Sequence, residues 1–517
     1  MNNQALETYV EQIKKTTLTQ LFQDNQNRHK ELSVTTDHLY FDFSRQLVTT
    51  ETIKLLINLA NEQKLKEKIA AMFAGEKINK TEKRSVLHVA LRSGQNKEVQ
   101  AVLAKIKAFS SRDLVGATGK KLKNIVAIGI GGSYLGPDYL ATALRPYAKP
   151  GVTLRFVANV DGTDFVEKTA DLDPQETLVI VISKTFTTAE TMQNANTAKA
   201  WMLKGLNNHP EAVKKHFIAV STAREEVQSF GIDPENMFGF WDWVGGRFSA
   251  TSAVGAVPLS LYLGFDNFQK ILDGATWLDE HFKNEPFEKN IPVLSALIDI
   301  WNINFLGYRT RALLPYSQGL SKLPAHTQQV EMESNGKLVD IDGKPVDFQT
   351  GEVVFGEAGT NGQHSFYQLL HQGTSIIPSD FIGFIKPQYK IENAAGNEVS
   401  HHEELMTNFL AQPDALAFGH KDEHLAKNFP GNRPSSSFLL KELTPFTTGL
   451  LLAWTEHRAA AKGFVWNINS FDQFGVQLGK VLGKDHRRRM IEFNKTGKIN
   501  VDGLNPSTAK LLTDFLG

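Results

Sequence analysis

The sequence predicts an α/β protein built from two αβα sandwich domains in tandem, each around a parallel sheet. The first observation is a set of short apolar, β-rich runs that alternate with helical stretches. These runs are apolar throughout, which is typical of strands that are covered on both faces of a sheet. The second is that the alternation occurs twice, on either side of a helical stretch at about 255–308. The third is the length, since 517 residues are too many for one compact core.

The chain begins with a helical region, which we expect over residues 1–104. Leu, Lys, Glu and Gln dominate it, and TIKLLINLANEQKLKEKIAAMF (52–73) repeats its apolar residues with helical periodicity. The first sandwich domain is expected over residues 105–270. Its strands are predicted from four apolar runs: NIVAIGIGG (124–132), LRFVANV (154–160), TLVIVISK (177–184) and HFIAVST (216–222).

The second sandwich domain is expected over residues 271–495. Its strands are predicted from three runs: RALLPYS (311–317), VVFGEAG (353–359) and FIGFIKP (381–387). The segment 391–435 is polar and punctuated by Gly and Pro, so we expect it on the surface. Residues 496–517 are expected to form a helical C-terminal tail. The two halves share no strict sequence repeat.

Composition excludes several classes of function. Lys and Arg together number 56, as do Asp and Glu, so net charge indicates neither nucleic acid nor a membrane as a partner. The absence of cysteine excludes disulfides, thiolate metal sites, iron–sulfur clusters and a cysteine nucleophile. The opening residues lack the apolar core of a signal peptide, and no apolar run approaches the ~20 residues of a membrane helix. We therefore expect a cytoplasmic protein.

Three familiar signatures are approached but not met. GATGKK (116–121) lacks the first glycine and the final hydroxyl of a Walker loop. GIGGSYLG (129–136) has Tyr134 in place of the third glycine of a dinucleotide-binding fingerprint. His420 and His424 have the spacing of metal ligands on a helix, but the charged residues between them favour a solvated helix face.

Two polar loops are better candidates for ligand binding. They follow the predicted strands of one sheet, and ligands of open α/β sheets bind beyond the carboxyl ends of the strands. Each loop opens a predicted helix, whose free N–H groups favour an anion, and glycines allow close approach. Hydroxyl donors are added by Ser133, Ser183, Thr185 and Thr188. Without metal-binding acids, such donors suit a phosphate monoester that is held rather than transferred. The alternative is a helix cap followed by a polar turn.

Four further stretches combine unusual residues: WDWVGGRFSATSAVG (241–255), QQVEMESNGK (328–337), GTNGQHSF (359–366) and SFDQFGVQLGK (470–480). Gln329 and Glu333 are four residues apart, so we expect them on one face of a helix. Gln473 and Lys480 are seven apart and are expected to share a helix face two turns on. Taken alone, each stretch has a structural explanation, because single histidines and helix carboxylates are more often structural or solvated.

Taken together, the motifs are specific. In this order, GIGGS, SKTFTT, DWVGGRFS, QQVEMESNGK, GTNGQH and FDQFGVQLGK resemble the glucose-6-phosphate isomerase (phosphoglucose isomerase) family. The resemblance runs from about residue 85 to residue 480. It implies two sugar-isomerase αβα domains, a homodimer, and an enzyme that needs no cofactor and no metal. The implied reaction converts D-glucose 6-phosphate reversibly to D-fructose 6-phosphate by ring opening and proton transfer through a cis-enediol.

The resemblance also implies roles for single residues. Glu333 corresponds to the base that moves a proton between C2 and C1, and Arg247 to the cation near the enediolate. His364 corresponds to the residue that opens the sugar ring and comes from the neighbouring subunit, and Lys480 to a lysine that assists. The other matches bind the phosphate or line the substrate: Gly132, Ser133, Ser183, Lys184, Thr185, Thr188, Gly246, Gln329, Gly359 and Gln473.

These residue types suit that chemistry. A positioned carboxylate can remove a weakly acidic C–H proton and return it to the next carbon. An arginine stays charged while it stabilises an oxyanion, and histidine exchanges protons near neutrality. Three alternatives stay open: a sugar-phosphate-binding regulatory module without catalysis, an isomerase that also accepts another sugar phosphate such as mannose 6-phosphate, and an extracellular signalling role.

Overall fold

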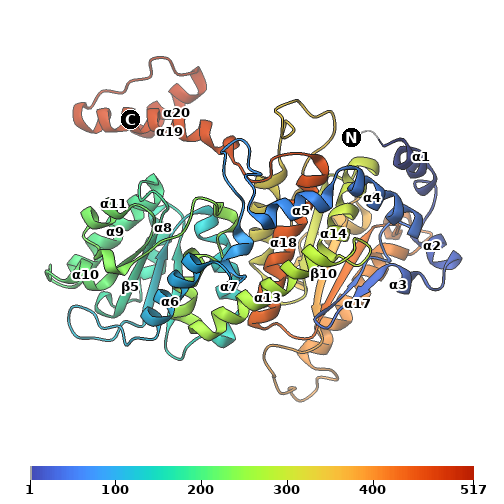
Figure 1. Cartoon of the computed structure of the whole chain (residues 1–517), viewed down its shortest axis with the longest axis horizontal. Coiled ribbons are helices and arrows are strands. Elements are labelled where there is room, and N and C mark those ends of the chain that lie inside the picture. Colours follow the sequence, from blue (N-terminus) through green and yellow to red (C-terminus); the bar gives the residue numbers. More distant parts are fainter. Residues whose placement is uncertain (1–2) are drawn as a thin grey trace. The chain divides into compact units, whose positions relative to one another are not determined.

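The computed structural model describes residues 3–517 and divides them into two compact units, 3–471 and 472–517. The larger unit contains two sheets flanked by helices (Figure 1), so the predicted α/β fold with two αβα sandwiches is confirmed. None of the helices over residues 3–517 combines the length and apolar character that a membrane span requires.

The first sheet is entirely parallel and has the strand order β4-β3-β5-β6-β7. Its strands are β3 (Asn124–Ile128), β4 (Thr153–Val157), β5 (Thr177–Ile182), β6 (Phe217–Val220) and β7 (Met237–Phe238). The four predicted runs all form strands, and β7 is an addition. β5 is buried along its whole length because it is covered on both faces. Ile180 packs into the large central core, whereas Val179 and Val181 pack into a smaller outer cluster.

Helices cover both faces of this sheet. The outer cluster is completed by residues of α8 (Gly162–Thr169), α9 (Ala189–Gly205), α10 (Ala212–His216) and α11 (Arg224–Phe230). The central core takes residues of α6 (Lys97–Ser110), α7 (Leu135–Ala143) and α12 (Ala253–Leu263). α12 is buried at every position, in keeping with its sequence AVGAVPLSLYL. The first sheet is therefore the middle layer of a sandwich.

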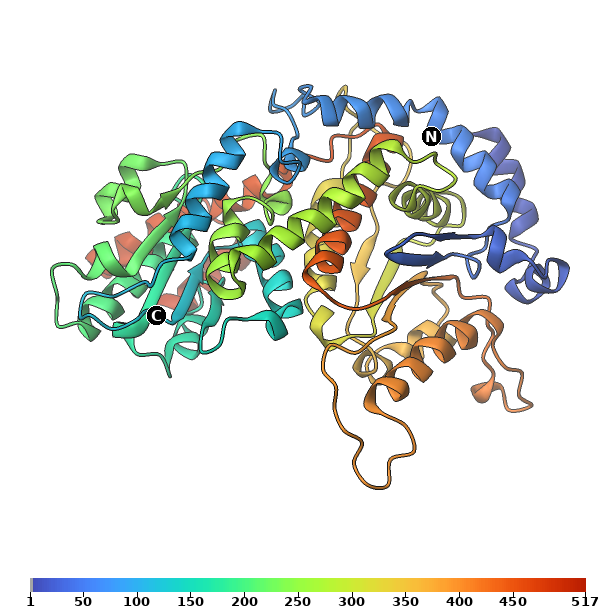
Figure 2. The same ribbon diagram turned by 60° about the horizontal axis from the view of Figure 1, so that its bottom comes forward.

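The second sheet is mixed and has the order β1-β2-β11-β10-β8-β9. Its strands are β1 (Ser33–Thr35), β2 (Leu39–Asp42), β8 (Thr310–Pro315), β9 (Val353–Phe355), β10 (Ser379–Phe384) and β11 (Ser435–Leu440). The last four are parallel to one another, as predicted for the domain. β1 and β2 run antiparallel at one edge, shown in dark blue in Figure 2. The N-terminal region, expected to be helical, thus also contributes two strands.

The N-terminal region is otherwise helical, as expected. Its helices before α6 are α1 (Gln4–Ile13), α2 (Leu18–Asp24), α3 (Arg28–Glu31), α4 (Thr50–Glu62) and α5 (Leu65–Ala74). α4 begins with a capping box in which Thr49 and Thr52 satisfy each other's backbone N–H groups. Its apolar residues Leu56 and Ile57 join the central core.

The predicted helical stretch at 255–308 and one later helix fill the centre of the larger unit. They are α13 (Phe265–Asn284), α14 (Ile291–Ile300) and α18 (Pro445–Trp466), with α13 and α18 side by side in Figure 1. Nearly every residue of α18 is buried, including Arg458 and Lys462. A buried helix that carries charges must pair them inside the protein. The remaining helices of this unit are α15 (Leu323–Gln328), α16 (Tyr367–Gln372) and α17 (His401–Phe418).

The polar segment that was expected on the surface is only partly exposed. Residues 391–399 are exposed, whereas Phe409 and Leu416 of α17 are buried. His420 and His424 are exposed, but the prediction that they share a helix face is wrong. They follow the end of α17, where His420 pairs with Phe429 in an isolated antiparallel bridge.

The smaller unit, 472–517, consists of a short turn and two helices. They are α19 (Gln477–Thr496) and α20 (Pro506–Leu516), so the expected C-terminal tail is helical. Arg489 of α19 fixes the connection between the two helices, because its guanidinium donates to the carbonyl oxygens of Asn500 and Asp502. Its Nε also donates to Asp485 at 2.8 Å, one turn earlier.

Candidate active site

The two polar loops lie where the first sheet reverses its strand order. From β3 the chain moves to β4 on one side, and it then returns to β5 on the other side of β3. The loops that leave the carboxyl ends of β3 and β5 therefore diverge and leave room for a ligand between them. The sequence places Gly132 and Ser133 in one loop, and residues 183–188 in the other.

The loop after β3 packs closely on a second glycine-containing turn. Gly131 has φ +57°, in the left-handed region that favours glycine, and Gly131–Ser133 forms a 3₁₀ turn before α7. A Cβ on Gly132 would lie 2.1 Å from the carbonyl carbon of Gly246, so only glycine fits. Gly246 begins the 3₁₀ turn Gly246–Phe248, which carries Arg247. The two glycines thus bring Arg247 close to the loop after β3.

The loop after β5 gathers hydroxyl groups at the start of α9. Thr188 is the N-cap residue of this helix, and its hydroxyl accepts from the hydroxyl of buried Ser183 at 3.3 Å. Exposed Thr185 shares a hydrogen bond of 2.7 Å with the hydroxyl of Thr187. Phe186 anchors the loop, since it is buried and has φ 54°. The helix start and the hydroxyls provide donors for an anion.

Lys184 lies in the same loop, and its backbone ties the loop to the end of β6. Its carbonyl oxygen accepts from the backbone N–H of Thr222 at 3.0 Å and from the Thr222 hydroxyl at 2.8 Å. Burial lowers the pKa of the Lys184 ammonium, and repulsion from Arg84 lowers it further. The side chain is half-buried.

Arg247 is buried, and its guanidinium contacts Ser334, Ser470 and Glu333. Its Nε donates to the Ser334 hydroxyl at 2.7 Å, and one Nη donates to the carbonyl oxygen of Ser470 at 2.5 Å. The other Nη lies 3.6 Å from a carboxylate oxygen of Glu333. The arginine side chain is only 1% exposed, whereas that of Glu333 is 23% exposed. The carboxylate thus meets both a fixed cation and solvent-accessible space.

Gln329 and Glu333 share one face of a helical segment, as expected, although the segment is a π-helix. It spans Gln329–Glu333 and continues α15. The Gln329 amide donates to Glu333 at 3.1 Å. A Cβ on Gly131 would lie 3.3 Å from the same amide nitrogen, so this segment reaches the loop after β3. π-helical turns are rare and occur frequently at functional sites.

Two further candidates lie on the loop after β9, apart from this pair. Gly359 packs on the ring of Tyr316, where a Cβ would lie 2.8 Å from the ring atoms. His364 ends the 3₁₀ turn Asn361–His364, and its side chain is exposed. Within residues 3–517, one group of predicted site residues comes together around Arg247: Gly132, Gly246, Arg247, Gln329 and Glu333. Ser183 and Thr188 meet separately in the loop after β5, and among the described residues no contact joins His364 to the group around Arg247.

Gln473 and Lys480 belong to the smaller unit. The prediction that they share a face of one helix is wrong. Gln473 is extended in φ, at −150°, and a 3₁₀ turn over Phe474–Val476 separates it from α19. Lys480 lies in the first turns of α19. Residues seven apart share a face only within a continuous α-helix, and here a tighter 3₁₀ turn lies between them.

Sequence reasoning missed a cluster of buried ion pairs, which includes Glu331 of the π-helical segment. One ion-pair cluster joins buried charged side chains of several elements: Asp299, Glu331, Glu352, Asp380, Arg311, Arg458 and Lys462. Burial alone would lower the pKa of Lys462, but the carboxylates of Asp299, Glu331 and Glu352 raise it. Burial raises the pKa of the Glu352 carboxyl. Single residues carry no sign of such pairing, because the partners are far apart in the sequence.

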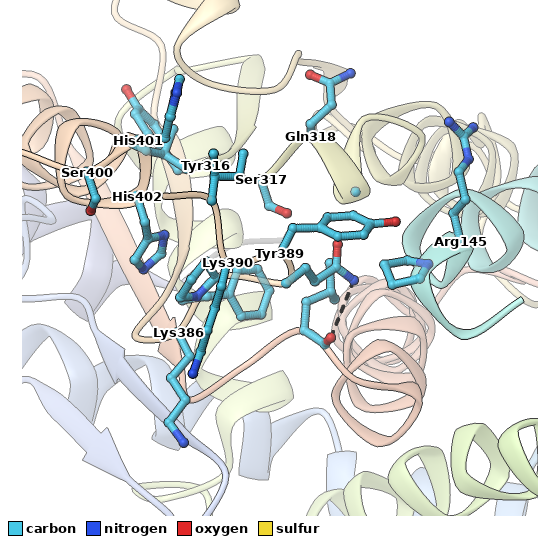
Figure 3. Close-up of a pocket in the computed structure, with 18 of the residues that line it drawn as sticks. Arg145, Tyr316, Ser317, Gln318, Lys386, Tyr389, Lys390, Ser400, His401 and His402 are labelled. Atoms are coloured by element: carbon cyan, nitrogen blue, oxygen red, sulfur yellow. Dashed lines mark hydrogen bonds between the residues drawn. The ribbon is translucent and has the colours of Figure 1, made fainter. Parts of the chain in front are cut away.

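A hollow of about 680 Å³ opens beyond the carboxyl ends of β8 and β10 (Figure 3). Tyr316, Tyr389 and Arg145 are among the side chains that line it. None of the predicted site residues lines this hollow, so the candidate site is defined by converging side chains instead. Among residues 3–517, no group of three or more His, Asp or Glu side chains is placed to hold a metal ion.

Comparison with known proteins agrees with this geometry. The chain matches the family described as phosphoglucose isomerase over residues 42–512. It is 52% identical to "Glucose-6-phosphate isomerase, cytosolic" of Arabidopsis thaliana, covering 99% of this chain and 96% of the relative. The protein of the same name from Zea mays is 52% identical, with 99% and 95% covered. The crystal structure of a glucose-6-phosphate isomerase from Chlamydia trachomatis superimposes with a TM-score of 0.88 at 33% identity, covering 99% and 98%.

Proposed function

This chain belongs to the phosphoglucose isomerase family, and we propose that it interconverts D-glucose 6-phosphate and D-fructose 6-phosphate through a cis-enediol. The protein is an aldose–ketose isomerase. The observation that carries the proposal is the pair of Glu333 and Arg247, 3.6 Å apart, beside a loop suited to phosphate. A base and a permanent cation side by side are what proton transfer through an oxyanion requires.

The phosphate of the substrate binds to the loops after β3 and β5. Ser133, Ser183, Thr185 and Thr188 donate hydroxyl groups, and Lys184 adds a positive charge. The start of α9 favours the anion, because its first backbone N–H groups have no partner within the helix. Binding of a non-reacting phosphate fixes the far end of the sugar and leaves C1 and C2 beside Glu333.

Glu333 removes the proton from C2 and returns it to C1. As the proton leaves, negative charge grows on the carbonyl oxygen, and Arg247 faces that charge without giving up a proton. The guanidinium is held by Ser334 and Ser470 before the substrate arrives, so little reorganisation is needed during the reaction. Gln329 donates to Glu333 and orients its carboxylate. Substrate-lining positions are assigned to Gly246, Gly359 and Gln473.

Ring opening precedes proton transfer and is assigned to His364 and Lys480. The protein acts as a homodimer in which His364 reaches the site of the neighbouring subunit. The exposure of His364 supports this assignment, as does its position apart from Glu333 in its own chain. Histidine suits this step because it can accept and donate a proton near neutrality.

No cofactor and no metal take part in the proposed reaction, because the proton returns to the substrate and no electrons leave it. The relatives from Arabidopsis thaliana and Zea mays are named cytosolic, which supports a cytoplasmic location for this chain. The pairing of Glu333 with Arg247 also argues against a purely regulatory module, since phosphate binding alone needs neither side chain.

The test is an assay of fructose 6-phosphate formation from glucose 6-phosphate in the presence of EDTA. We expect full activity with the chelator, and almost none when Glu333 is replaced by Gln. Mannose 6-phosphate, run in parallel, reports whether the epimer at C2 is also a substrate. A folded wild-type protein that binds glucose 6-phosphate without forming fructose 6-phosphate would refute the proposal in favour of a binding module.

A further inference from the structure

We infer that Asn335 is a positioning residue, which fixes Arg247 against Glu333 through Ser470. Asn335 would not touch the substrate itself; it would hold Arg247 in place beside Glu333. This inference rests on the proposed function and extends it to a residue of the protein interior. It is carried by two hydrogen bonds that meet at Ser470, one from its hydroxyl to Asn335 and one from Arg247 to its backbone carbonyl oxygen, and all three residues are almost completely buried.

The Asn335 side chain uses both ends of its amide. Its Nδ2 donates to Glu331 at 2.7 Å and to the carbonyl oxygen of Ala459 at 3.0 Å. Its Oδ1 accepts from the Ser470 hydroxyl at 2.7 Å. Only one orientation of the amide satisfies two acceptors on one side and a donor on the other. Asn335 is 0% exposed, so water cannot replace these bonds.

Ser470 connects Asn335 to Arg247. Its hydroxyl is held by Asn335, and its carbonyl oxygen accepts from the guanidinium at 2.5 Å. The fit is tight, since a Cβ on Gly463 of α18 would lie 1.8 Å from the Ser470 hydroxyl oxygen. Ser334, which accepts from the Arg247 Nε, is the residue directly before Asn335 in the chain. These two contacts of the guanidinium therefore depend on one short segment, residues 334–335.

The buried ion-pair cluster gives these hydrogen bonds a rigid base. Glu331 binds Lys462 at 2.9 Å, and Lys462 also binds Asp299 at 2.8 Å and Glu352 at 2.7 Å. Lys462 and Ala459, to which Asn335 donates, both lie on α18, which is buried in the centre of the larger unit. Buried charges that are paired in this way hold one another in place, because separating one from its partner leaves an uncompensated charge in the interior.

Removing the Asn335 amide should loosen Arg247 while leaving the phosphate site intact. In Asn335→Ala, the Ser470 hydroxyl loses its acceptor, and Glu331 and Ala459 lose a donor. A misplacement of about 1 Å at a reacting group can cost about 100-fold in rate. The hydrogen bonds of Asn335 do not involve the loops after β3 and β5, so these loops should keep the phosphate. The expected signature is a loss of kcat rather than of substrate affinity.

The experiment compares Asn335→Ala with Asn290→Ala, Ser470→Ala and the wild type. Asn290 is a matched control: it is equally buried and donates to the carbonyl oxygens of His281 and Phe282, outside the site. Two ligands separate the effects. Sorbitol 6-phosphate reports phosphate binding, and a phosphorylated sugar hydroxamate, whose head is planar and anionic, mimics the enediolate.

We expect Asn335→Ala to lower kcat about 100-fold with KM changed less than about threefold. Affinity for the hydroxamate should fall by a similar factor, whereas affinity for sorbitol 6-phosphate should stay within about threefold of wild type. Ser470→Ala removes only the hydroxyl and should lower kcat about tenfold. Asn290→Ala should lower the melting temperature without changing the ratio of the two affinities.

The outcomes separate this inference from the proposed function. If Asn335→Ala does not fold, kcat and hydroxamate affinity of Ser470→Ala test the inference instead. Unchanged kcat and hydroxamate affinity in the folded variants would overturn the inference, whereas a wild type without isomerase activity would instead refute the proposed function.

Discussion

Gly132 and Gly246 face each other, but replacing each by alanine should have a different effect. Gly132→Ala should destabilise the fold, whereas Gly246→Ala should weaken substrate binding and leave stability nearly unchanged. A Cβ on Gly132 would lie 2.1 Å from the Gly246 carbonyl carbon and 2.6 Å from the Arg247 nitrogen. Carbon atoms prefer about 3.5–4.0 Å, so the two turns would have to separate by roughly 1 Å or more. Overpacking of this kind costs about 1–3 kcal/mol of stability and would displace Arg247.

A Cβ on Gly246, in contrast, meets nothing closer than the Cα of Gly132 at 4.0 Å. Gly246→Ala should therefore fold with a free energy of unfolding within about 0.5 kcal/mol of wild type. We propose that substrate occupies the open space at Gly246, so the added methyl group should weaken substrate binding by about 1–3 kcal/mol, or roughly 5- to 150-fold.

The assay for both variants is urea unfolding followed by titration with sorbitol 6-phosphate. We expect a stable Gly246→Ala protein with weak binding, and a destabilised Gly132→Ala protein. A Gly246→Ala protein that binds sorbitol 6-phosphate as tightly as wild type would place the substrate elsewhere. A Gly132→Ala protein as stable and active as wild type would contradict the close contact between the two turns.

Three further predictions concern the phosphate, the dimer and pH. Ser183→Ala and Thr185→Ala should each weaken binding of sorbitol 6-phosphate by about 1.5–3 kcal/mol, measured by calorimetry, and unchanged affinity in both would mean that the phosphate binds elsewhere. Mixing Glu333→Gln with His364→Ala subunits should restore about a quarter of wild-type activity, because about half of the dimers are hybrids with one complete site; no recovery after proven subunit exchange would place His364 in its own chain's site. Burial lowers the pKa of His326 to about 4, and among residues 3–517 its two ring nitrogens find no hydrogen-bond partner. The unfolded chain therefore takes up this proton at a higher pH than the folded protein does, and about 3 kcal/mol of the free energy of unfolding should be lost as pH falls from about 6.5 to about 4. Urea titrations of His326→Phe should not show that loss.

Much of the fold was predictable because it follows from local patterns. The runs at 124–132, 154–160, 177–184 and 216–222 became β3 to β6, since apolar runs without alternation form covered parallel strands. β11 was missed because its first residues, Ser435 and Ser436, look like a polar loop. β1 and β2 were missed because they are short and gain their stability from long-range pairing: β2 pairs with β11, and β1 pairs with β2.

The candidate site was predictable where glycines and hydroxyl groups follow strands, and less so where partners are distant. Glu331 resembles a solvated helix carboxylate in the sequence, yet it is 2% exposed and paired with Lys462, far along the chain. The π-helical turn at Gln329–Glu333 has no sequence signal, because it differs from an α-helix only in backbone hydrogen bonding. The spacing of Gln473 and Lys480 predicted one helix face, but a 3₁₀ turn over Phe474–Val476 lies between the two residues.

Isomerisation in heavy water would show whether Glu333 carries the proton between C2 and C1. A proton resting on a carboxylate can exchange with solvent, so wild type should place deuterium on C1 of fructose 6-phosphate and on C2 of recovered glucose 6-phosphate, detected by NMR. Glu333→Gln keeps the shape and removes the basicity, so isomerisation and deuterium incorporation should fall together by about 10²–10⁴-fold or more. The same variant should still speed interconversion of the ring anomers, because ring opening is assigned to His364 and Lys480. If a folded Glu333→Gln protein isomerised and incorporated deuterium at near wild-type rates, Glu333 would not be the base.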